Sequence, residues 1–386
     1  MPQHTHFIPI TKPWMDDQEI EAARRPILTG WVTQGPEVAA FEEEFAQYVG
    51  ARFACAVSSC TTALHLALLA VGVRPGDEVI TVSHSFIATA NSIRYCGAIP
   101  VFVDIQPRTF NMDPQLIENL ITKRTRAILC VHQMGMPCDL EEILKIGHRY
   151  LFPVIEDAAC AIGSEIFWKG QWERIGKPQG EIACFSFHPR KVITTGDGGM
   201  ITTSNPEWDR TFRLLRQHGM SIPDRVRHDA EEVLIESYQV LGYNYRMTDI
   251  QGAIGREQVK RLPEIIRKRR FLAGRYKELL SDVPGIGLPE EPSWARSNWQ
   301  SYCVYLPNAC NQSKVMKFLL DRGVATRRGI MCIHQEEAYR NFSNPCTLSE
   351  SERAKEHCII LPLYHQMTEE NQKYVVEVLK EACQAA

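Results

Sequence analysis

The sequence has little net charge, and no hydrophobic run in it is long enough to cross a membrane. Its 43 Lys and Arg residues nearly balance 46 Asp and Glu residues, giving a formal net charge of −3. This balance gives no reason to expect nucleic acid or an acidic membrane as the partner. A membrane span needs about 20 mostly apolar residues in a row. Residues 1–11 also lack the basic start and apolar core of a signal peptide.

Paired cysteine motifs are also missing, although the chain has 13 cysteines. No Cys-x-x-Cys occurs, the number is odd, and several cysteines stand in apolar runs, where a free thiol behaves as a small hydrophobe. We therefore expect no disulfide framework and a location in the reducing cytoplasm. His132 and Cys138 could contribute to a metal site, but no convincing third and fourth ligands accompany them, so we expect no metal.

Internal repeats are absent, and what the chain has instead is an alternation of strand and helix patterns between residues 50 and 205. Several apolar runs are nearly continuous, which is typical of strands covered on both faces. Helical patterns such as Thr61–Val71 and Leu116–Ile121 lie between them. The alternation predicts an α/β fold with a mostly parallel sheet flanked by helices. The seven expected strands are Phe53–Val57, Glu78–Val82, Pro100–Asp104, Ala127–Val131, Pro153–Glu156, Ile182–Phe187 and Met200–Thr203.

The organisation of the chain predicts three parts. Residues 1–30 form an N-terminal arm with a short helix around Asp17–Leu28, residues 31–260 form a large domain, and residues 261–386 form a smaller C-terminal α+β domain. The boundary falls in a long helical pattern that Pro263 is expected to interrupt. The small domain is expected to contain the strand Tyr302–Leu306 and the helices Ser313–Arg322 and Glu369–Ala382.

One lysine, Lys191, follows an apolar strand in a segment that also carries hydroxyls and, at 196–199, three glycines. A lysine amine can form a Schiff base with an aldehyde cofactor if its surroundings keep it neutral. Asp157 ends another apolar strand, where a carboxylate could pair with a protonated ring nitrogen. Such a lysine and such an acid are the two protein groups that pyridoxal phosphate chemistry requires. The plain alternatives are a surface lysine and an acid that caps a turn.

Three further features would suit such a cofactor. Ser59, Cys60 and Thr61 stand where a strand ends and a helix begins, and a helix N-terminus can hold a phosphate. The alternative is a plain N-cap. Phe86 follows another strand end and could stack on a ring, although core packing explains it equally well. Ser186 could bind the phosphate, and the glycines at 196–199 would allow a tight turn and a close backbone approach.

Eight motifs occur in a fixed order along the chain. They are Trp31-x-x-x-Gly35, Ser58–Leu64, Ser85-Phe86-x-Ala88-Thr89, Glu156-Asp157-Ala158-Ala159, Ser186-Phe187-x-x-x-Lys191, Thr195-Gly196-Asp197-Gly198-Gly199, His218-Gly219 and Gly242-Tyr243-Asn244-Tyr245-Arg246-Met247. Together they resemble the DegT/DnrJ/EryC1/StrS aminotransferases over roughly residues 8–380. The resemblance implies a fold-type I enzyme that uses pyridoxal 5′-phosphate to aminate keto groups of nucleotide-linked sugars.

The resemblance also implies a role for individual residues. Lys191 would be the Schiff-base lysine and proton shuttle, Asp157 would pair with the pyridine nitrogen, and Phe86 would stack on the ring. Asn244 would reach the phosphate from the neighbouring subunit, so that a homodimer shares its active sites. The residues implied at the phosphate are Ser59, Cys60, Thr61, Ser186 and Asn244.

The chain departs from the family pattern at three positions. Many relatives have Asn and Gly where this chain has Ser59 and Cys60, which puts only the detail of a backbone contact in doubt. Many also have Gln or His at the position of Cys160, where that residue touches the phenolic oxygen of the cofactor. We therefore expect the contact at Cys160 to be missing or to be supplied from elsewhere.

The implied reaction is a two-stage amino transfer from glutamate to a keto-sugar, with Lys191 moving the protons. The motifs are most similar to those of perosamine-synthase-like enzymes, which aminate C4 of a 4-keto-6-deoxy sugar, a chemistry of lipopolysaccharide O-antigen synthesis. A nucleotide diphosphate needs cations and aromatic surfaces. The candidates are Trp31, Arg246, Arg327 and His334, each of which could instead be an ordinary surface residue.

Three other functions can be compared with the sequence. A pyridoxal-phosphate 3-dehydratase would have histidine in place of the lysine, but Lys191 is present and His188 is three positions too early. A cyclitol aminotransferase, acting on a keto-inositol without a nucleotide, is compatible with the core motifs. A non-catalytic sensor that binds the cofactor or a nucleotide-sugar is the alternative from another class. Added glutamate should remove the yellow absorbance band of the bound cofactor in an enzyme but not in a sensor.

Overall fold

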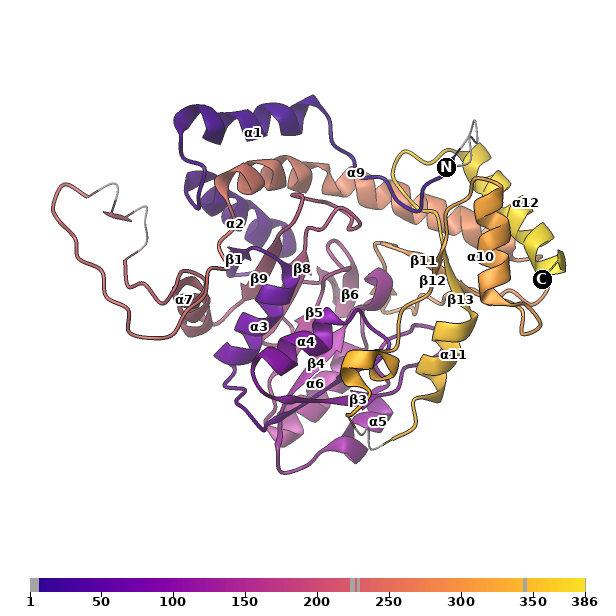
Figure 1. The fold of residues 1–386 in the computed structure, drawn as a ribbon, viewed down its shortest axis with the longest axis horizontal. Helices are drawn as coiled ribbons and strands as arrows, with labels where there is room; N and C mark the ends of the chain where they lie inside the picture. The colour runs from indigo at the N-terminus through magenta and orange to yellow at the C-terminus, as the bar shows by residue number, and fades with distance from the viewer. Residues whose placement is uncertain (1–6, 223–225, 228–229, 343–345, 386) are drawn as a thin grey trace.

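The computed structural model describes residues 7–222, 226–227, 230–342 and 346–385 (Figure 1). At its centre is a seven-stranded sheet with the strand order β1-β9-β8-β5-β4-β2-β3. β9 is antiparallel to both of its neighbours, and the other adjacent pairs are parallel. The strands are β1 (Phe53–Val57), β2 (Glu78–Val82), β3 (Ile99–Val103), β4 (Thr125–Val131), β5 (Val154–Asp157), β8 (Ile182–Ser186) and β9 (Gly199–Thr203). The seven predicted strands are thus confirmed, with ends that differ by at most two residues.

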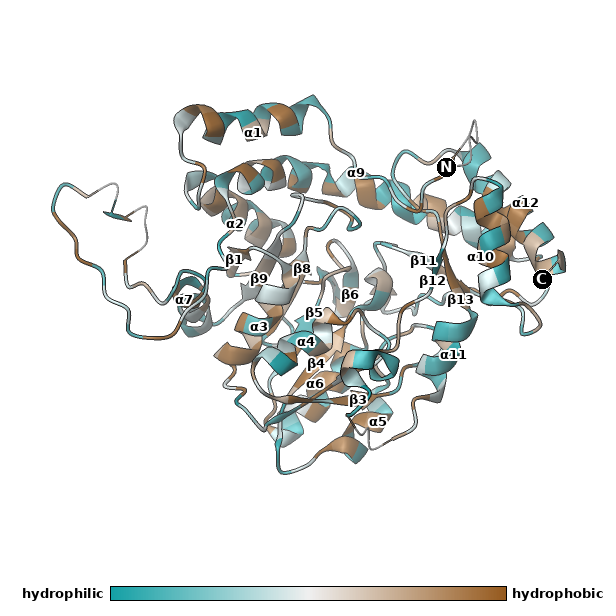
Figure 2. Cartoon of the chain, viewed as in Figure 1, coloured by the Kyte–Doolittle hydropathy of each residue, from teal (hydrophilic) through white to brown (hydrophobic). Residues whose placement is uncertain are grey.

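Successive residues of the central strands enter two different cores, one on each face of the sheet. Ile80 and Ile128 belong to one buried cluster, whereas their neighbours Val79 and Leu129 belong to the other. This period of two explains why the strands are apolar throughout. The helices around the sheet are α2 (Pro36–Val49), α3 (Cys60–Ala70), α4 (Ala88–Tyr95), α5 (Pro114–Ile117), α6 (Leu140–Tyr150) and α7 (Pro206–Leu215), with short 3-10 turns at Glu118–Leu120 and Gln133–Gly135. Figure 2 shows the strands as largely hydrophobic.

The longest helix, α9 (Asp249–Leu280), continues through Pro263, so the predicted interruption is wrong. Proline removes one backbone hydrogen bond and crowds the preceding turn. Buried Leu262 and Ile265 on either side of it keep the helix in place, because α9 packs along α1 and α2. The boundary proposed between residues 260 and 261 therefore falls inside one helix, and the division into domains stays a prediction.

The C-terminal part has its own core around a three-stranded antiparallel sheet, ordered β11-β13-β12. Its elements are β11 (Tyr302–Tyr305), α10 (Gln312–Asp321), β12 (Arg327–Arg328), α11 (Ser349–His357), β13 (Cys358–Leu361) and α12 (Glu369–Ala385), with 3-10 turns at Ile333–Gln335 and Glu337–Tyr339. The strand and both helices predicted here are present. A second small sheet, formed by β10 (Ala295–Arg296), β6 (Glu165–Trp168) and β7 (Gln171–Arg174), was not predicted.

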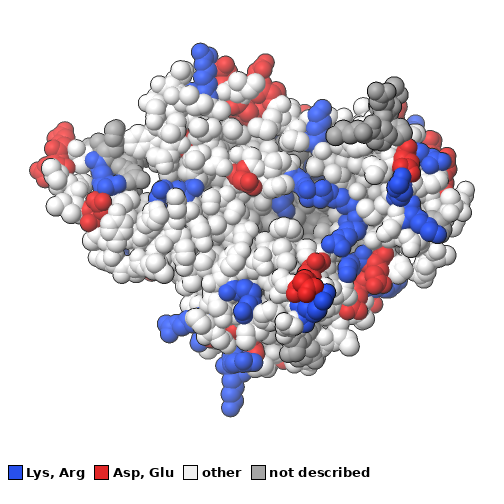
Figure 3. All heavy atoms as spheres, in the orientation of Figure 1, with Lys and Arg blue, Asp and Glu red and all other residues white. Residues whose placement is uncertain are grey.

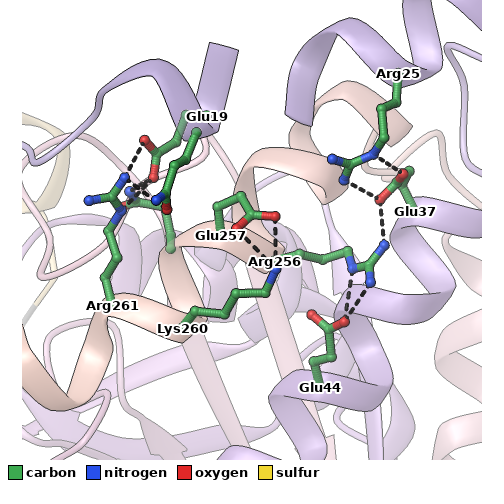
Figure 4. A network of polar contacts seen from close by, with 10 residues as sticks. Glu19, Arg25, Glu37, Glu44, Arg256, Glu257, Lys260 and Arg261 are labelled. Atoms are coloured by element: carbon green, nitrogen blue, oxygen red, sulfur yellow. Dashed lines mark hydrogen bonds and ion pairs between the residues drawn. The ribbon is translucent and has the colours of Figure 1, made fainter. Parts of the chain in front are cut away.

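The N-terminal arm is fixed to α9 by charged side chains. Residues 1–6 of that arm lie outside the described residues, and α1 (Asp17–Thr29) follows the predicted helix closely. Arg261 of α9 binds Glu19 at 2.9 Å and also contacts Asp16, while Arg256 binds Glu37 at 2.8 Å (Figure 4). Glu37 also binds Arg25 of α1 at 3.0 Å. α1, α2 and α9 are thereby joined at several points along one side of the molecule (Figure 1).

No helix within the described residues is long and apolar enough to cross a membrane.

Candidate active site

The candidate site lies where the parallel strands of the large sheet end. β5 ends at Asp157, β1 leads through Ser59 into α3, and β8 leads into the loop that carries Lys191. The Lys191 Nζ contacts the Cys160 Sγ at 3.1 Å, and Cys60 and Asp157 are near enough to affect the pKa of this lysine, so the four residues lie near one another. The carboxyl ends of the strands are where ligands bind in sheets of this kind.

The loop between β8 and β9 holds Lys191 in place. The Lys191 N–H donates to the carbonyl of His188 at 2.8 Å, and the Thr194 hydroxyl donates to the carbonyl of Phe187 at 2.7 Å. Gly196 turns the chain with φ of +87°, which confirms the expected use of a glycine there. The lysine Nζ lies 3.1 Å from the Cys160 Sγ, a contact that the sequence did not predict.

The surroundings of Lys191 do not by themselves keep its amine neutral. Burial lowers its pKa, but the charge of Cys160, the hydrogen bond to that sulfur and the charges of Cys60 and Asp157 raise the pKa by more. The net effect is a pKa above the ordinary lysine value. A neutral lysine therefore requires a further positive charge nearby, which a protonated cofactor ring would provide.

Asp157 is buried and held by two donors. The Thr89 hydroxyl donates to its Oδ2 at 2.8 Å, and the Ala159 N–H donates to its Oδ1 at 3.2 Å. Burial raises the pKa of Asp157, and the two hydrogen bonds oppose that rise. Ser85 in turn contacts the Thr89 hydroxyl at 2.8 Å. Thr89 was part of a predicted motif but had no predicted role, because nothing in the sequence shows that its hydroxyl meets a strand 68 residues away.

The start of α3 has the predicted form of an anion site, with one difference. The Ser59 hydroxyl accepts the N–H of Thr62 at 3.2 Å, so this side chain is the N-cap and does not point a free hydroxyl at a ligand. The N–H groups of Cys60 and Thr61 lie in the first turn, where acceptors within the helix are missing. A Cβ on Gly199 would come within 2.4 Å of the Ser59 carbonyl carbon, so glycine is needed for this close approach.

Two other predicted cofactor residues flank the same space. Ser186 ends β8, and its hydroxyl accepts the N–H of His188 at 3.4 Å. Phe86 precedes α4, and its side chain is 68% exposed, so the ring is not part of the core. Its exposure removes the alternative of core packing and leaves a ring face open for stacking.

Asn244 lies beside α3 of its own chain. The Tyr245 carbonyl accepts the N–H of Ser58 at 2.8 Å, and the Tyr245 hydroxyl contacts His65 at 3.1 Å. Asn244 itself is exposed. The structure thus brings this segment to the start of α3, while the role of the Asn244 side chain stays a prediction.

The four predicted substrate residues do not all gather in one place. The Trp31 indole lies across Gly35, where a Cβ would come within 1.8 Å of it, which explains the spacing of that motif. Arg246 lines a cavity of about 250 Å³ together with Gly35, Arg213 and Arg216, and Lys191 is not among the lining residues.

His334 is already engaged within the protein. Its Nδ1 lies 2.6 Å from the Ser83 hydroxyl, and its Nε2 lies 3.0 Å from Glu352. It therefore joins the end of β2 to α11. A role in positioning this loop fits these contacts better than direct substrate binding.

Arg327 is exposed on β12, and burial together with the charge of nearby Arg190 lowers its pKa. Among the described residues, neither Arg190 nor Arg327 has a carboxylate within 4.0 Å, whereas Arg328 binds Glu336 at 3.7 Å. Figure 3 shows Lys and Arg side chains gathered on the face between the large and small sheets. Two close cations without an acid favour an anionic ligand.

His132 and Cys138, the two candidate metal ligands, form a buried hydrogen-bonded group with Glu156. His132 Nδ1 accepts the N–H of Cys138 at 3.0 Å, and its Nε2 lies 2.9 Å from Glu156. In the part of the chain that the structure describes, no three His, Cys, Asp or Glu residues are grouped to hold a metal ion.

Comparison with known proteins agrees with this geometry. The family model of the DegT/DnrJ/EryC1/StrS aminotransferases matches residues 13–380. The spore coat polysaccharide biosynthesis protein SpsC of Bacillus subtilis is 34% identical over 100% of this chain and 99% of its own. The structure of DesV from S. venezuelae has a TM-score of 0.89 at 30% identity, covering 98% of this chain and 99% of that one. The sugar aminotransferase Spr1654 of Streptococcus pneumoniae, described as putative and solved in its PLP form, has a TM-score of 0.89 at 26% identity, with coverage of 98% and 99%.

The fold is accordingly that of the fold-type I aminotransferases. The helix N-terminus at Cys60, the carboxylate of Asp157 and the amine of Lys191 are groups of the kinds that pyridoxal phosphate needs, and they lie near one another. The chain therefore belongs to the DegT/DnrJ/EryC1/StrS aminotransferase family and is a pyridoxal-phosphate-dependent aminotransferase of that family.

Proposed function

We propose that this enzyme transfers the amino group of glutamate to a keto group of a nucleotide-linked sugar, of the 4-keto-6-deoxy kind. The observation that carries the proposal is the placement of Lys191, Asp157 and the start of α3 around one space, with Phe86 exposed beside it. Pyridoxal phosphate, when bound, supplies an electron sink that stabilises negative charge on the substrate carbon. The cytoplasm is the proposed location, in keeping with 13 cysteines that form no Cys-x-x-Cys motif.

Each protein group has a definable task. Asp157, held by Thr89 and Ala159, keeps its carboxylate aimed at the ring nitrogen and favours the protonated ring. The N–H groups of Cys60 and Thr61 bind the phosphate. The Lys191 amine takes a proton from the substrate carbon and returns it on the cofactor side, which requires the neutral amine.

The acceptor is proposed to be a nucleotide-sugar because of the cations beside Lys191. Burial and the charge of Arg190 lower the pKa of Arg327, neither arginine has an acid partner among the described residues, and a diphosphate would bind both. Arg328 offers a matched control, since it is also exposed on β12 but binds Glu336. Arg327→Gln should weaken binding of a nucleoside diphosphate about 10-fold, and Arg328→Gln should leave it nearly unchanged.

A homodimer with shared active sites is also proposed. Between α7 and α9 the chain extends away from the body of the molecule (Figure 1). Within this segment Val233, Ile235 and Leu241 are 92%, 85% and 84% exposed, and Ile27 and Leu28 of α1 are exposed as well. Large apolar side chains exposed to this extent favour an interface with another protein, and a second copy is the commonest partner.

The test is a panel of nucleotide-linked keto-sugars incubated with the enzyme, pyridoxal phosphate and glutamate, with products followed by mass spectrometry. Amination of at least one sugar with release of 2-oxoglutarate is expected. Lys191→Ala should lower the rate by about 1,000-fold or more. Lys145→Ala, an exposed lysine paired with Glu142, should leave it unchanged. Amination of free keto-inositols alone, or full turnover by Lys191→Ala, would refute the proposal.

A further inference from the structure

The Lys191 amine has a sulfur as its closest side-chain partner. Its Nζ donates to the Cys160 Sγ at 3.1 Å, and both residues are half-buried. Among the described residues no carboxylate lies within 4.0 Å of this amine. Cys160 is held in the turn after β5, where its carbonyl accepts the Asn298 side-chain amide at 2.8 Å. The two reactive atoms are therefore held together by separate elements.

We propose that Cys160 and Lys191 form an oxidant-sensitive pair that closes a covalent bond between Sγ and Nζ when peroxide is present. In the first step hydrogen peroxide oxidises the thiol to a sulfenic acid, and one water is released. In the second step the lysine nitrogen attacks the sulfur, the sulfur–oxygen bond breaks, and the hydroxyl leaves with one amine proton as a second water. Sulfur supplies the two electrons that reduce the peroxide, so thiol, amine and peroxide yield one sulfenamide and two waters.

The charges around the pair favour this order of steps. Burial lowers the pKa of Lys191, and the contact with the Cys160 sulfur is among the effects that raise it. Oxidation to a sulfenic acid weakens that contact, because the sulfur becomes electron-poor. Burial then favours the neutral amine, which is the form that can attack the sulfur.

The bond would close the cofactor site reversibly. Lys191 could not accept the cofactor aldehyde while its nitrogen is bound to sulfur, and a thiol reductant would restore it. This consequence rests on the proposed function, whereas the bond itself does not. Cys60 faces the same space and is the obvious competitor, since a disulfide between Cys60 and Cys160 would also remove two hydrogens.

The experiment treats the full-length protein, stripped of cofactor, with about one equivalent of hydrogen peroxide and measures its intact mass. A loss of about 2 Da is expected, reversed by dithiothreitol, with peptide mapping that joins the Cys160 and Lys191 peptides. Cys160→Ser should abolish the loss, and Cys60→Ser should retain it. Bound pyridoxal phosphate should prevent the reaction.

Three results would overturn the inference: oxygen added to Cys160 with no joined peptide, a joined product about 14 Da heavier that retains oxygen, or disappearance of the 2 Da loss in Cys60→Ser. The outcome is independent of turnover. A protein that forms the bond but aminates no sugar would refute the proposed function alone, and an active aminotransferase that never forms the bond would refute this inference alone.

Discussion

The Thr89 hydroxyl is the side-chain donor that holds Asp157 in the orientation needed at the ring nitrogen. It has one proton to donate, and the 2.8 Å contact gives that proton to the carboxylate. Because burial raises the pKa of Asp157, loss of this bond would raise it further. The protein would then hold the protonated cofactor ring less well, although no atom of Thr89 needs to touch the cofactor.

Thr89→Val is therefore expected to weaken pyridoxal phosphate binding by about 10-fold or more, since hydrogen bonds to charged groups contribute about 1.5–3 kcal/mol. The dissociation constant can be followed by the visible absorbance of the bound cofactor. Thr89→Ser keeps the hydroxyl and should restore the affinity. Equal affinity of Thr89→Val and the wild type would show that Asp157 does not depend on this bond.

His84 illustrates a different effect of burial on a single residue. Burial lowers its pKa to about 3, and among the described residues neither ring nitrogen has a hydrogen-bond partner. The folded protein therefore binds fewer protons here than the unfolded chain, whose histidine has a pKa of about 6.5. The stability associated with neutral His84 is present above pH 6.5 and is lost progressively as the pH falls toward 3.

His84→Phe should remove this dependence, because a phenylalanine ring is apolar at every pH and the neighbouring Phe110 already stacks on the ring of His84. From pH 7 to pH 5 the wild type should lose about 2 kcal/mol more unfolding free energy than the variant. Urea denaturation at the two pH values measures this difference. The exposed His148→Gln serves as the control, and a variant with the same pH dependence as the wild type would contradict the assignment.

The sequence predicted the charged residues that follow or end apolar strands, but it did not predict which side chains form hydrogen bonds with them. Lys191 and Asp157 could be found because a lysine and an acid at the ends of apolar strands are uncommon. The Thr89 and Cys160 contacts depend on how distant strands are placed side by side, which local patterns do not encode. For the same reason the sequence, which makes His334 a candidate substrate residue, does not predict the contacts of its ring nitrogens with Ser83 and Glu352.

At the scale of elements, the apolar strands were predictable and the helix α9 was predictable only in part. Strand burial on both faces leaves a strong pattern in the sequence. Pro263 was expected to interrupt a helix, because a proline inside a helix costs about 3 kcal/mol. Packing of α9 against α1 and α2 supplies more than that cost, and such packing cannot be read from neighbouring residues. Tertiary packing therefore keeps the helix continuous despite the local cost of the proline.

The packing of α2 on α9 gives a prediction at this scale. A Cβ on Gly252 would come within 2.8 Å of the Val38 backbone, which cannot rotate away, whereas a Cβ on Gly274 of the same helix would meet nothing within 4 Å. Gly252→Ala should lower the free energy of unfolding by about 1–3 kcal/mol. Gly274→Ala should raise it by about 0.5–1 kcal/mol, because alanine favours the helix. Thermal and urea unfolding of both variants measure the contrast, and equal effects would show that the two helices do not approach this closely.

At the scale of the whole molecule, a single chain leaves residues at the candidate site exposed to solvent. Phe86 is exposed, and so are the apolar side chains of the segment between α7 and α9. The Tyr245 carbonyl binds Ser58 of the same chain, which places Asn244 near the start of α3 but does not direct its side chain into the same site. Two arrangements follow: Asn244 completes the site of its own chain, or it completes the site of a partner. The family resemblance implied the second, and contacts within one chain do not distinguish them.

A hybrid dimer distinguishes the two arrangements. Lys191→Ala and Asn244→Glu should each inactivate a homodimer, the first by removing the amine and the second by placing a negative charge near the phosphate. If Asn244 serves the partner, a hybrid with one subunit of each kind has one site with both native residues and should show about half the wild-type activity. If Asn244 serves its own chain, both hybrid sites carry a defect and the hybrid should be inactive. Co-expression with two different affinity tags isolates the hybrid, and a hybrid of Lys191→Ala with wild type, which keeps one complete site in either arrangement, calibrates the assay.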